Sequence, residues 1–409
     1  MNVATAPAWV VGTFDTKAPE LDYVAGLLRA AGVRVFTVDI GTRGAEGVAD
    51  LGARDVAAHH PRGSGAVFGT SDRGEAVTAM GEALGLCVLA GLADGRIAGM
   101  LGLGGSGGTS MIAPAMRRLP IGMPKLLVST MASGNVAPYV DVMDLMLMYP
   151  VTDIAGLNRL SRTILANAAH AMAGMLTHHA PALDAAQDQP AIGLSMFGVT
   201  TPCVQAVRSI LQADFDAQVF HANGSGGRTL EALAAAGLLN AVVDLTTTEV
   251  GQHLHGGVCD AGPNRLDAAA RHGLPWVGSL GALDMINFGA RHTIPERHRD
   301  RLFHVHNPDV TLMRSNADEL RAAGERIAEQ LNRARGPVRL LLPLRGLSML
   351  DAPGQAFHAP EANAALFDTL RRCFAASEAH RLIELDLHIN DPAFADTVAR
   401  QVREVMALA

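Results

Sequence analysis

A glycine-rich segment holds the backbone groups best suited to bind an anion. It runs Gly102-Leu-Gly-Gly-Ser-Gly-Gly-Thr-Ser110, follows the apolar run Ile97–Leu103 and leads into a helical run. Glycine permits positive φ and close approach, so a strand, a glycine turn and a helix in succession aim backbone N–H groups at a phosphate. The alternative is a purely structural turn. The residues that we expect to bind the phosphate are Gly104, Gly105, Ser106, Gly107, Gly108 and Thr109.

Two better-known phosphate motifs do not describe this segment. Its glycines match the dinucleotide fingerprint by letter, but the segment lies about a hundred residues into the chain. Lys125 stands in the neighbourhood where an acidic residue would bind the ribose of NAD. No Gly-Lys-Ser/Thr sequence occurs, so the turn is not a Walker A loop either. Phosphate binding by backbone amides is compatible with both exclusions.

A second polar segment, Gly12-Thr-Phe-Asp-Thr-Lys17, follows the first apolar strand. Its hydroxyls and ammonium can donate to phosphate oxygens, and its carboxylate is a hard ligand for Mg²⁺. The alternative is a capped helix start, with Asp15 or Thr16 ahead of Pro19. Lys17 and Lys125 are the two lysines of the chain, and both fall beside turns where an ammonium can meet a phosphate. The nucleotide-binding residues expected here are Gly12, Thr13, Asp15, Thr16 and Lys17.

The end of the second expected strand supplies a further candidate, Asp39. A carboxylate at this place commonly accepts hydrogen bonds from ribose hydroxyls. We expect Asp39 beside the ribose, with an ordinary loop carboxylate as the alternative.

The second half of the chain carries a different set of polar groups. Glu249 comes after the apolar strand Ala241–Leu245, and His253 and His255 follow shortly. With Arg345, which suits a carboxylate- or phosphate-bearing substrate, they are expected to act on a second ligand by acid–base chemistry or direct contact. Structural hydrogen bonding is one alternative and metal ligation another. Four-coordinate zinc would normally need more thiolate or imidazole, so we expect no protein-held metal.

The order of apolar and helical runs predicts the scaffold that positions these residues. Strands alternate with helices throughout, which indicates an α/β protein of two Rossmann-like, doubly wound subdomains with largely parallel sheets. The expected ranges are 1–180 and 191–409, joined by a linker at about 181–190. The segment starting at Ile192 parallels the one starting at Val10, and a second glycine turn occurs at 223–229, so a duplication is indicated. Ligands of such sheets bind beyond the carboxyl ends of the strands.

Composition limits the function classes. The formal net charge of −7 argues against nucleic-acid binding, which needs a basic face. The four cysteines form no CxxC pair and indicate reduced thiols. No apolar run approaches the ~18 residues of a membrane span, and no secretory signal pattern is present. We expect a cytoplasmic protein that does not bind membranes.

Several segments together carry a family resemblance: Gly12–Lys17, Gly104–Thr109, Asp244–Glu249, His306–Pro308 with Thr311–Arg314, and Leu342–Gly346. With them, the chain resembles the bacterial relatives of the ATP-binding amino-terminal domain of the tomato mosaic virus resistance protein. The resemblance covers nearly the whole chain. It implies two Rossmann-like subdomains, ATP as a ligand, and self-association as a homodimer.

We therefore expect an ATP-binding protein with ATP and Mg²⁺ on the first subdomain. A small-molecule second ligand is expected in a cleft between the subdomains. One alternative is a metabolic enzyme that hydrolyses a small oxygenated acid or cleaves a C–C bond in it, with a regulatory or vestigial nucleotide site. Another is a non-catalytic regulator whose nucleotide controls assembly with a partner.

Overall fold

The computed structural model describes residues 6–43, 48–178 and 189–408. The chain divides into two compact units, Met1–Ala182 and Leu183–Ala409. Most of the expected linker, residues 181–188, lies outside the described residues. Each unit is an α/β domain built on a parallel sheet, as the alternation of strands and helices predicts.

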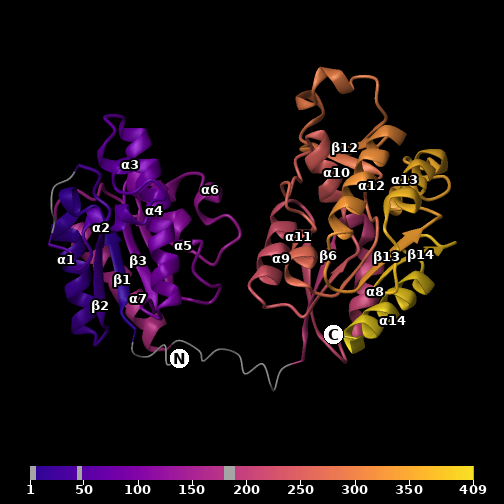
Figure 1. The fold of residues 1–409 in the computed structure, drawn as a ribbon. Coiled ribbons are helices and arrows are strands. Elements are labelled where there is room, and N and C mark those ends of the chain that lie inside the picture. Colours follow the sequence, from indigo (N-terminus) through magenta and orange to yellow (C-terminus); the bar gives the residue numbers. More distant parts are fainter. Residues whose placement is uncertain (1–5, 44–47, 179–188, 409) are drawn as a thin grey trace. The chain divides into compact units, whose positions relative to one another are not determined.

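The first unit contains a five-stranded parallel sheet in the order β2-β1-β3-β4-β5. Figure 1 labels β2, β1 and β3 of this sheet. Val11 of β1 pairs with Val38 on one side and with Gly102 on the other. The chain therefore winds outward in both directions from β1, and the strand order reverses between β1 and β3. Ligands bind at this kind of switch point in open α/β sheets. The strands are β1 (Ala8–Gly12), β2 (Val35–Asp39), β3 (Gly99–Gly104), β4 (Lys125–Ser129) and β5 (Met146–Met148).

Helices cover both faces of this sheet. Side chains alternate along β1, so Trp9 and Val11 pack in one core cluster while Ala8 and Val10 pack in another. The first cluster lies under α2 (Ala53–Ala58), α3 (Gly65–Phe68), α4 (Arg73–Ala93) and α5 (Ser106–Met116). The second lies under α1 (Phe14–Ala30) and α7 (Arg159–Thr177), and the short α6 (Ala137–Val140) follows β4. Buried strands in such a sandwich are apolar along their whole length, as observed here.

Helix α4 is long and apolar enough, by composition, to cross a membrane. Half of its most apolar stretch is buried within the described part of the first unit. Met80, Leu84 and Val88 are fully buried in the core under this helix. The apolar composition of α4 is therefore that of a core helix.

The second unit repeats this topology on a larger scale. Its six-stranded parallel sheet has the order β14-β13-β9-β8-β6-β7, with the reversal between β6 and β8. The strands are β6 (Ala191–Met196), β7 (Asp216–His221), β8 (Ala241–Asp244), β9 (Trp276–Gly278), β13 (Val338–Pro343) and β14 (His380–Leu385). Helices α8 (Thr201–Leu211) and α14 (Pro392–Leu408) cover one face. The other face is covered by α9 (Ser225–Ala235), α10 (Thr248–His255), α12 (Ala317–Leu331) and α13 (Pro360–Cys373), and α11 (Asp267–His272) packs against α9.

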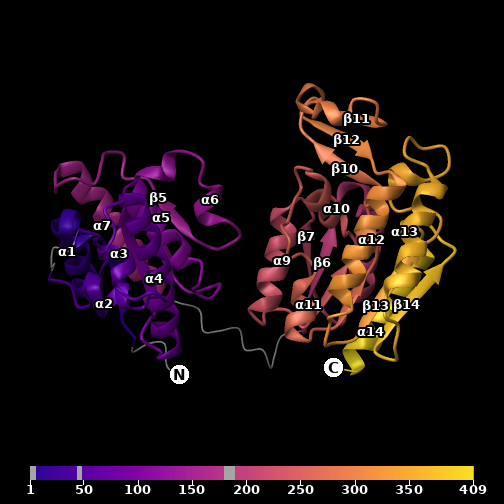
Figure 2. The same ribbon diagram turned by 45° about the horizontal axis from the view of Figure 1, so that its top comes forward.

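A small antiparallel sheet extends from the second unit (Figure 2). Its order is β10-β12-β11, with bounds Met285–Phe288, Val310–Arg314 and Phe303–Asn307. The sequence predicts a strand at Leu302–His306, but it does not indicate the antiparallel pairing of that strand with β12. The sheets of this unit are thus largely, but not wholly, parallel.

Candidate functional site

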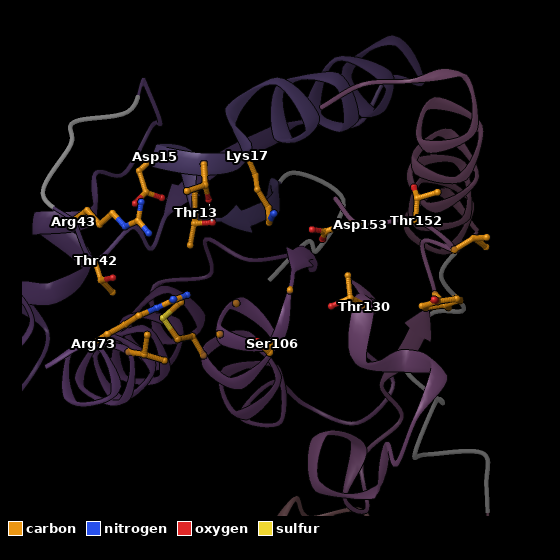
Figure 3. A pocket seen from close by; sticks show the side chains of 18 residues that line it. Thr13, Asp15, Lys17, Thr42, Arg43, Arg73, Ser106, Thr130, Thr152 and Asp153 are labelled. Atoms are coloured by element: carbon orange, nitrogen blue, oxygen red, sulfur yellow. Dashed lines mark hydrogen bonds between the residues drawn. The ribbon is translucent and has the colours of Figure 1, made fainter. Parts of the chain in front are cut away.

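A cavity of about 590 Å³ opens beyond the carboxyl ends of the strands of the first unit (Figure 3). Its volume falls within the range of small-molecule sites. Its position at the β1/β3 reversal agrees with the general rule for ligands of open sheets. The residues that line it are Thr13, Asp15, Thr16, Lys17, Thr42, Arg43, Arg73, Val77, Gly105, Ser106, Gly107, Gly108, Met111, Thr130, Tyr149, Val151, Thr152 and Asp153.

The glycine turn after β3 forms one wall of this cavity. Helix α5 begins at Ser106, and its N-cap Gly105 offers no side-chain hydrogen bond to the helix. The first N–H groups of an α-helix have no partner within the helix, so they are available to a ligand. An added Cβ would meet nothing within 4 Å at Gly107, whereas at Gly104 it would lie 2.6 Å from the nitrogen of Thr109. The tight turn at Gly104 therefore presents the following amides to open space.

Four residues expected at the nucleotide do not line the cavity: Gly12, Asp39, Gly104 and Thr109. Thr109 is buried, and its hydroxyl lies 2.6 Å from the hydroxyl of Ser129, which ties α5 to β4. Gly12 and Gly104 lie behind the wall, and an added Cβ on Gly12 would meet the side chain of Leu21 at 2.8 Å. Gly12, Gly104 and Thr109 therefore support the two turns from positions behind the cavity wall.

The segment after β1 forms the facing wall. Lys17 has φ −133° and interrupts the helical backbone of α1. Its ammonium donates a hydrogen bond of 2.5 Å to the carbonyl of Ile154, so it reaches across to the segment after β5. The hydroxyls of Thr13 and Thr16 lie 2.8 Å apart. The N-cap residue of α1 is Thr13, and its side chain makes no capping hydrogen bond. Asp15 and Thr16 lie within the first turn of α1, so neither is the N-cap that the alternative requires.

Asp39 lies beneath the cavity and is fully buried. Its Oδ1 accepts hydrogen bonds from the backbone N–H groups of Phe14 (2.9 Å) and Gly41 (2.8 Å), while Oδ2 has no partner. Burial raises the pKa of Asp39, the two backbone donors lower it, and the nearby Asp15 carboxylate raises it. Asp39 organises the segments after β1 and β2. Its expected contact with a ribose stays a prediction.

The sequence does not indicate the cavity residues on the segments after β2 and β5 or at the start of α4. Among them Arg43 and Arg73 carry positive charge, and Tyr149 and Val151 present exposed apolar surface. The signal that could have indicated Arg73 is its position directly after Asp72, which caps α4 by accepting a hydrogen bond from the N–H of Glu75. The closeness of Arg73 to the glycine turn, however, depends on the strand order, which the sequence does not specify.

The expectation that Lys125 meets a phosphate is wrong. Lys125 is the first residue of β4 and therefore lies at the opposite edge of the sheet from the glycine turn. Its ammonium donates to the carbonyls of Pro120 (2.6 Å) and Met123 (2.9 Å) and pairs with Asp144 at 2.8 Å. Burial lowers the pKa of Lys125, and Asp144 raises it. All three donors of the ammonium are used within the chain.

The second glycine turn, before α9, is already filled by a carboxylate. Glu249 is fully buried, and its Oε1 accepts hydrogen bonds from the N–H groups of Gly224 (2.7 Å) and Gly227 (3.0 Å). Its Oε2 accepts a hydrogen bond of 2.7 Å from Arg265, which also forms a bidentate pair with Asp244. Gly227 must be glycine, because an added Cβ would overlap the Glu249 carboxylate. Glu249 thus holds the turn together from a position closed to solvent.

The other residues expected to act on a second ligand have separate partners. His253 Nδ1 lies 3.0 Å from Asp260 Oδ1, and His255 Nε2 lies 3.4 Å from the carbonyl of Glu319. Arg345 is exposed and forms a bidentate pair with Asp386 at 2.7 Å. No hydrogen bond or ion pair joins these groups to one another or to Glu249 in the described residues. Their shared cleft between the two units stays a prediction.

Comparison with known proteins identifies the family. Residues 7–181 match the N-terminal domain, and residues 189–406 the C-terminal domain, of the uncharacterised protein family UPF0261. The chain belongs to the UPF0261 family.

Relatives of this UPF0261 chain occur in bacteria and in a plant. It is 53% identical over 393 residues to a UPF0261 protein of Mesorhizobium japonicum, covering 96% of this chain and 97% of that protein. It is 39% identical over 399 residues to a UPF0261 protein of Clostridium tetani, covering 97% and 98%. The ToMV resistance protein Tm-1 of Solanum lycopersicum is 38% identical over 418 residues. That match covers 97% of this chain but only 55% of the tomato protein. The resemblance to the tomato protein inferred from the sequence motifs is thus confirmed.

Proposed function

We propose that the first unit binds ATP, with its phosphates on the glycine turn between β3 and α5. The observation that carries this proposal is the wall formed by Gly105–Gly108, where uncapped N–H groups at the start of α5 meet a cavity of about 590 Å³. A helix N-terminus carries partial positive charge and favours anions. The same cavity has Lys17 on its facing wall.

The charges around the cavity support a polyphosphate. Lys17, Arg43 and Arg73 contribute three cations, against the carboxylates of Asp15 and Asp153. Charge-assisted hydrogen bonds from ammonium and guanidinium groups to phosphate oxygens are stronger than those between neutral groups. The excess of cations, added to the amides of the turn, favours a ligand with several negative charges.

The residues around Gly41 also fit the Mg²⁺ that accompanies ATP. Asp15 Oδ1 and Asp39 Oδ2 are buried without a hydrogen-bond partner. An ideal Cβ on Gly41 would lie 3.2 Å from Asp15 Cγ and 3.2 Å from Asp39 Oδ1, so the two carboxylates flank one glycine. Mg²⁺ in nucleotide sites takes one or two carboxylates together with phosphate oxygens. Bound there, it would neutralise phosphate charge, and Asp15 on the cavity wall would hold it.

Titration calorimetry of the full chain with ATP and Mg²⁺ tests the proposal. We expect one ATP per chain, because Glu249 already occupies the corresponding turn of the second unit. Chromatographic detection of ADP in the same sample separates turnover from binding alone. Absence of any binding heat up to millimolar ATP would contradict the proposal.

A further inference from the structure

Two arginines of the cavity have no partner among the residues that the structure describes. Arg43 follows β2, and Arg73 is the first residue of α4. Neither guanidinium group forms a hydrogen bond, an ion pair or a ring contact within the described residues, although both arginines line the cavity (Figure 3). Other arginines of the chain, such as Arg301 and Arg345, are paired with carboxylates. The donors of Arg43 and Arg73 therefore remain available to a ligand, and a guanidinium can bind phosphate oxygens in a bidentate manner.

The opposite end of the cavity carries an exposed aromatic and an exposed aliphatic side chain, next to Thr152 and Asp153. Tyr149 and Val151 follow β5 and are 42% and 57% exposed. Val151 has φ +67°, a backbone conformation that is rare for a β-branched residue. Such strained positions cluster at ligand sites, where the surrounding structure holds them. An exposed aromatic ring and an aliphatic side chain suit the face of a base.

The strand order separates these two ends. In the order β2-β1-β3-β4-β5, Arg43 follows one edge strand and Tyr149 follows the other, with the glycine turn after the central β3. Four strand spacings amount to about 19 Å, since neighbouring strands lie about 4.8 Å apart. The cavity therefore has room for an elongated ligand. The arginines lie at one end of the cavity, the amides of the glycine turn lie in the middle, and Tyr149 and Val151 lie at the other end. Figure 3 shows Arg43 and Arg73 on the side away from Thr130 and Thr152.

We propose that Arg43 and Arg73 bind the terminal phosphates of the nucleotide, while Tyr149 and Val151 support its base. This assignment rests on the proposed binding of ATP. It implies that Arg43 and Arg73 distinguish a nucleoside triphosphate from a nucleoside monophosphate. The α-phosphate lies at the glycine turn in this orientation. The ribose then lies on the side of Tyr149, so Asp39, which ends β2, would not contact it as the sequence predicts. A monophosphate then fills the turn without reaching the arginines.

Titration calorimetry with ATP, ADP, AMP and adenosine tests the assignment on a double variant, Arg43→Ala with Arg73→Ala. We expect ATP affinity to fall by roughly tenfold for each arginine removed, because each substitution removes one charge-assisted contact to the bound ATP. The affinity for AMP should change less than about threefold. The matched control is Arg29→Ala with Arg62→Ala, which removes the same charge from exposed positions of the first unit outside the cavity. The control should leave both affinities within threefold of those of the unaltered chain.

A second variant, Tyr149→Ala, tests the orientation. It should weaken adenosine, AMP and ATP by similar factors, because all three share the base. Suppose that ATP binds the unaltered chain, but that the double arginine variant binds ATP and AMP with equally reduced affinity or with unchanged affinity. The assignment of the arginines is then wrong, and the proposed function stands. If the unaltered chain binds no nucleotide, the proposed function fails and the assignment fails with it.

Discussion

Glu249 accepts a hydrogen bond of 3.0 Å from the N–H of Gly227, so a carboxylate of the chain occupies the glycine turn of the second unit. The corresponding turn of the first unit, at Gly105–Gly108, borders an open cavity. One turn is thus closed by the protein's own anion, and the other is open to an external one. The two units share a topology but are not equivalent as anion sites.

Glu249→Ala should destabilise the second unit. The substitution leaves the buried Arg265 with fewer partners and leaves two amides of the turn without an acceptor. Breaking a buried ion pair in this way costs about 3–5 kcal/mol in the free energy of unfolding. In a Trp9→Phe background, Trp276 is the remaining tryptophan and reports unfolding of the second unit by fluorescence in urea.

The control for this prediction is Glu329→Ala, which removes a carboxylate from a surface pair with Arg326. Surface pairs contribute about 1 kcal/mol or less. A cost for Glu249→Ala no larger than that of the control would show that Glu249 does not hold the turn.

Lys17→Ala should weaken ATP more than adenosine. The ammonium reaches the cavity from the wall opposite the glycine turn, and loss of a charge-assisted phosphate contact corresponds to about 1.5–3 kcal/mol of binding free energy. Calorimetric titration measures both ligands. Equal, small losses for ATP and adenosine would place Lys17 outside the phosphate site.

Lys125→Met provides the matched lysine variant. Because the ammonium of Lys125 is buried and bonded at the other edge of the sheet, this change should lower thermal stability while ATP affinity stays unchanged. A selective loss of ATP affinity in Lys125→Met would contradict the location of the site.

Removal of Mg²⁺ should weaken ATP binding in the unaltered chain but much less in Asp15→Asn. The carboxylate of Asp15 lines the cavity and has a buried oxygen without a partner, which suits a cation. Titrations with Mg²⁺ and with EDTA, on both proteins, measure the dependence. If both proteins depend on Mg²⁺ to the same extent, Asp15 does not hold the cation.

Asp284 should make the stability of the second unit depend on pH. Burial, aided by the neighbouring Asp351 carboxylate and opposed by Arg314, raises the pKa of Asp284 to about 7. The folded state therefore binds more protons than the unfolded state between about pH 4 and 7. Through this window, the contribution of Asp284 to the free energy of unfolding falls as pH rises.

Urea unfolding at several pH values, with Trp276 as the reporter, measures this slope. Asp284→Asn keeps the shape of the side chain and removes its titration, so the slope contributed by Asp284 should disappear. Identical slopes in the two proteins would show that Asp284 is not protonated in the folded state near pH 6.

The sequence predicts most of the fold because buried parallel strands are short, apolar and separated by helices. β1 and β3 are recognisable in this way, and each is followed by a glycine turn or a polar turn. β10 and β12 are not, because no helix separates β10 from β9 or β12 from β11, so the alternation of strands and helices does not mark them. Their antiparallel pairing joins Met285 with Arg314, a contact that no local pattern specifies.

The candidate site is predictable only in part. Gly107 and Lys17 follow strands of the first unit directly, so the rule for open sheets places them at the cavity. Arg73 and Tyr149 reach the same cavity through the strand order, which the sequence does not specify. For Glu249 the sequence predicts contact with a second ligand, because a carboxylate after a strand commonly lies at a ligand site. In the structure Glu249 is buried and accepts a hydrogen bond from Arg265, so it stabilises the fold.

We expect ATP phosphates to lie on the turn at Gly105–Gly108. Gly107→Val tests this location of the phosphates, because an added Cβ at Gly107 meets nothing within 4 Å and Gly107 lines the cavity. Gly26→Val is the matched control, since Gly26 also lies in a helix with open space around an added Cβ but outside the cavity.

Calorimetric titration of both variants with ATP, after circular dichroism has established that both are folded, is the deciding measurement. We expect ATP affinity to fall at least tenfold in Gly107→Val and to stay unchanged in Gly26→Val. Unchanged ATP affinity in a folded Gly107→Val protein would contradict this location of the phosphates.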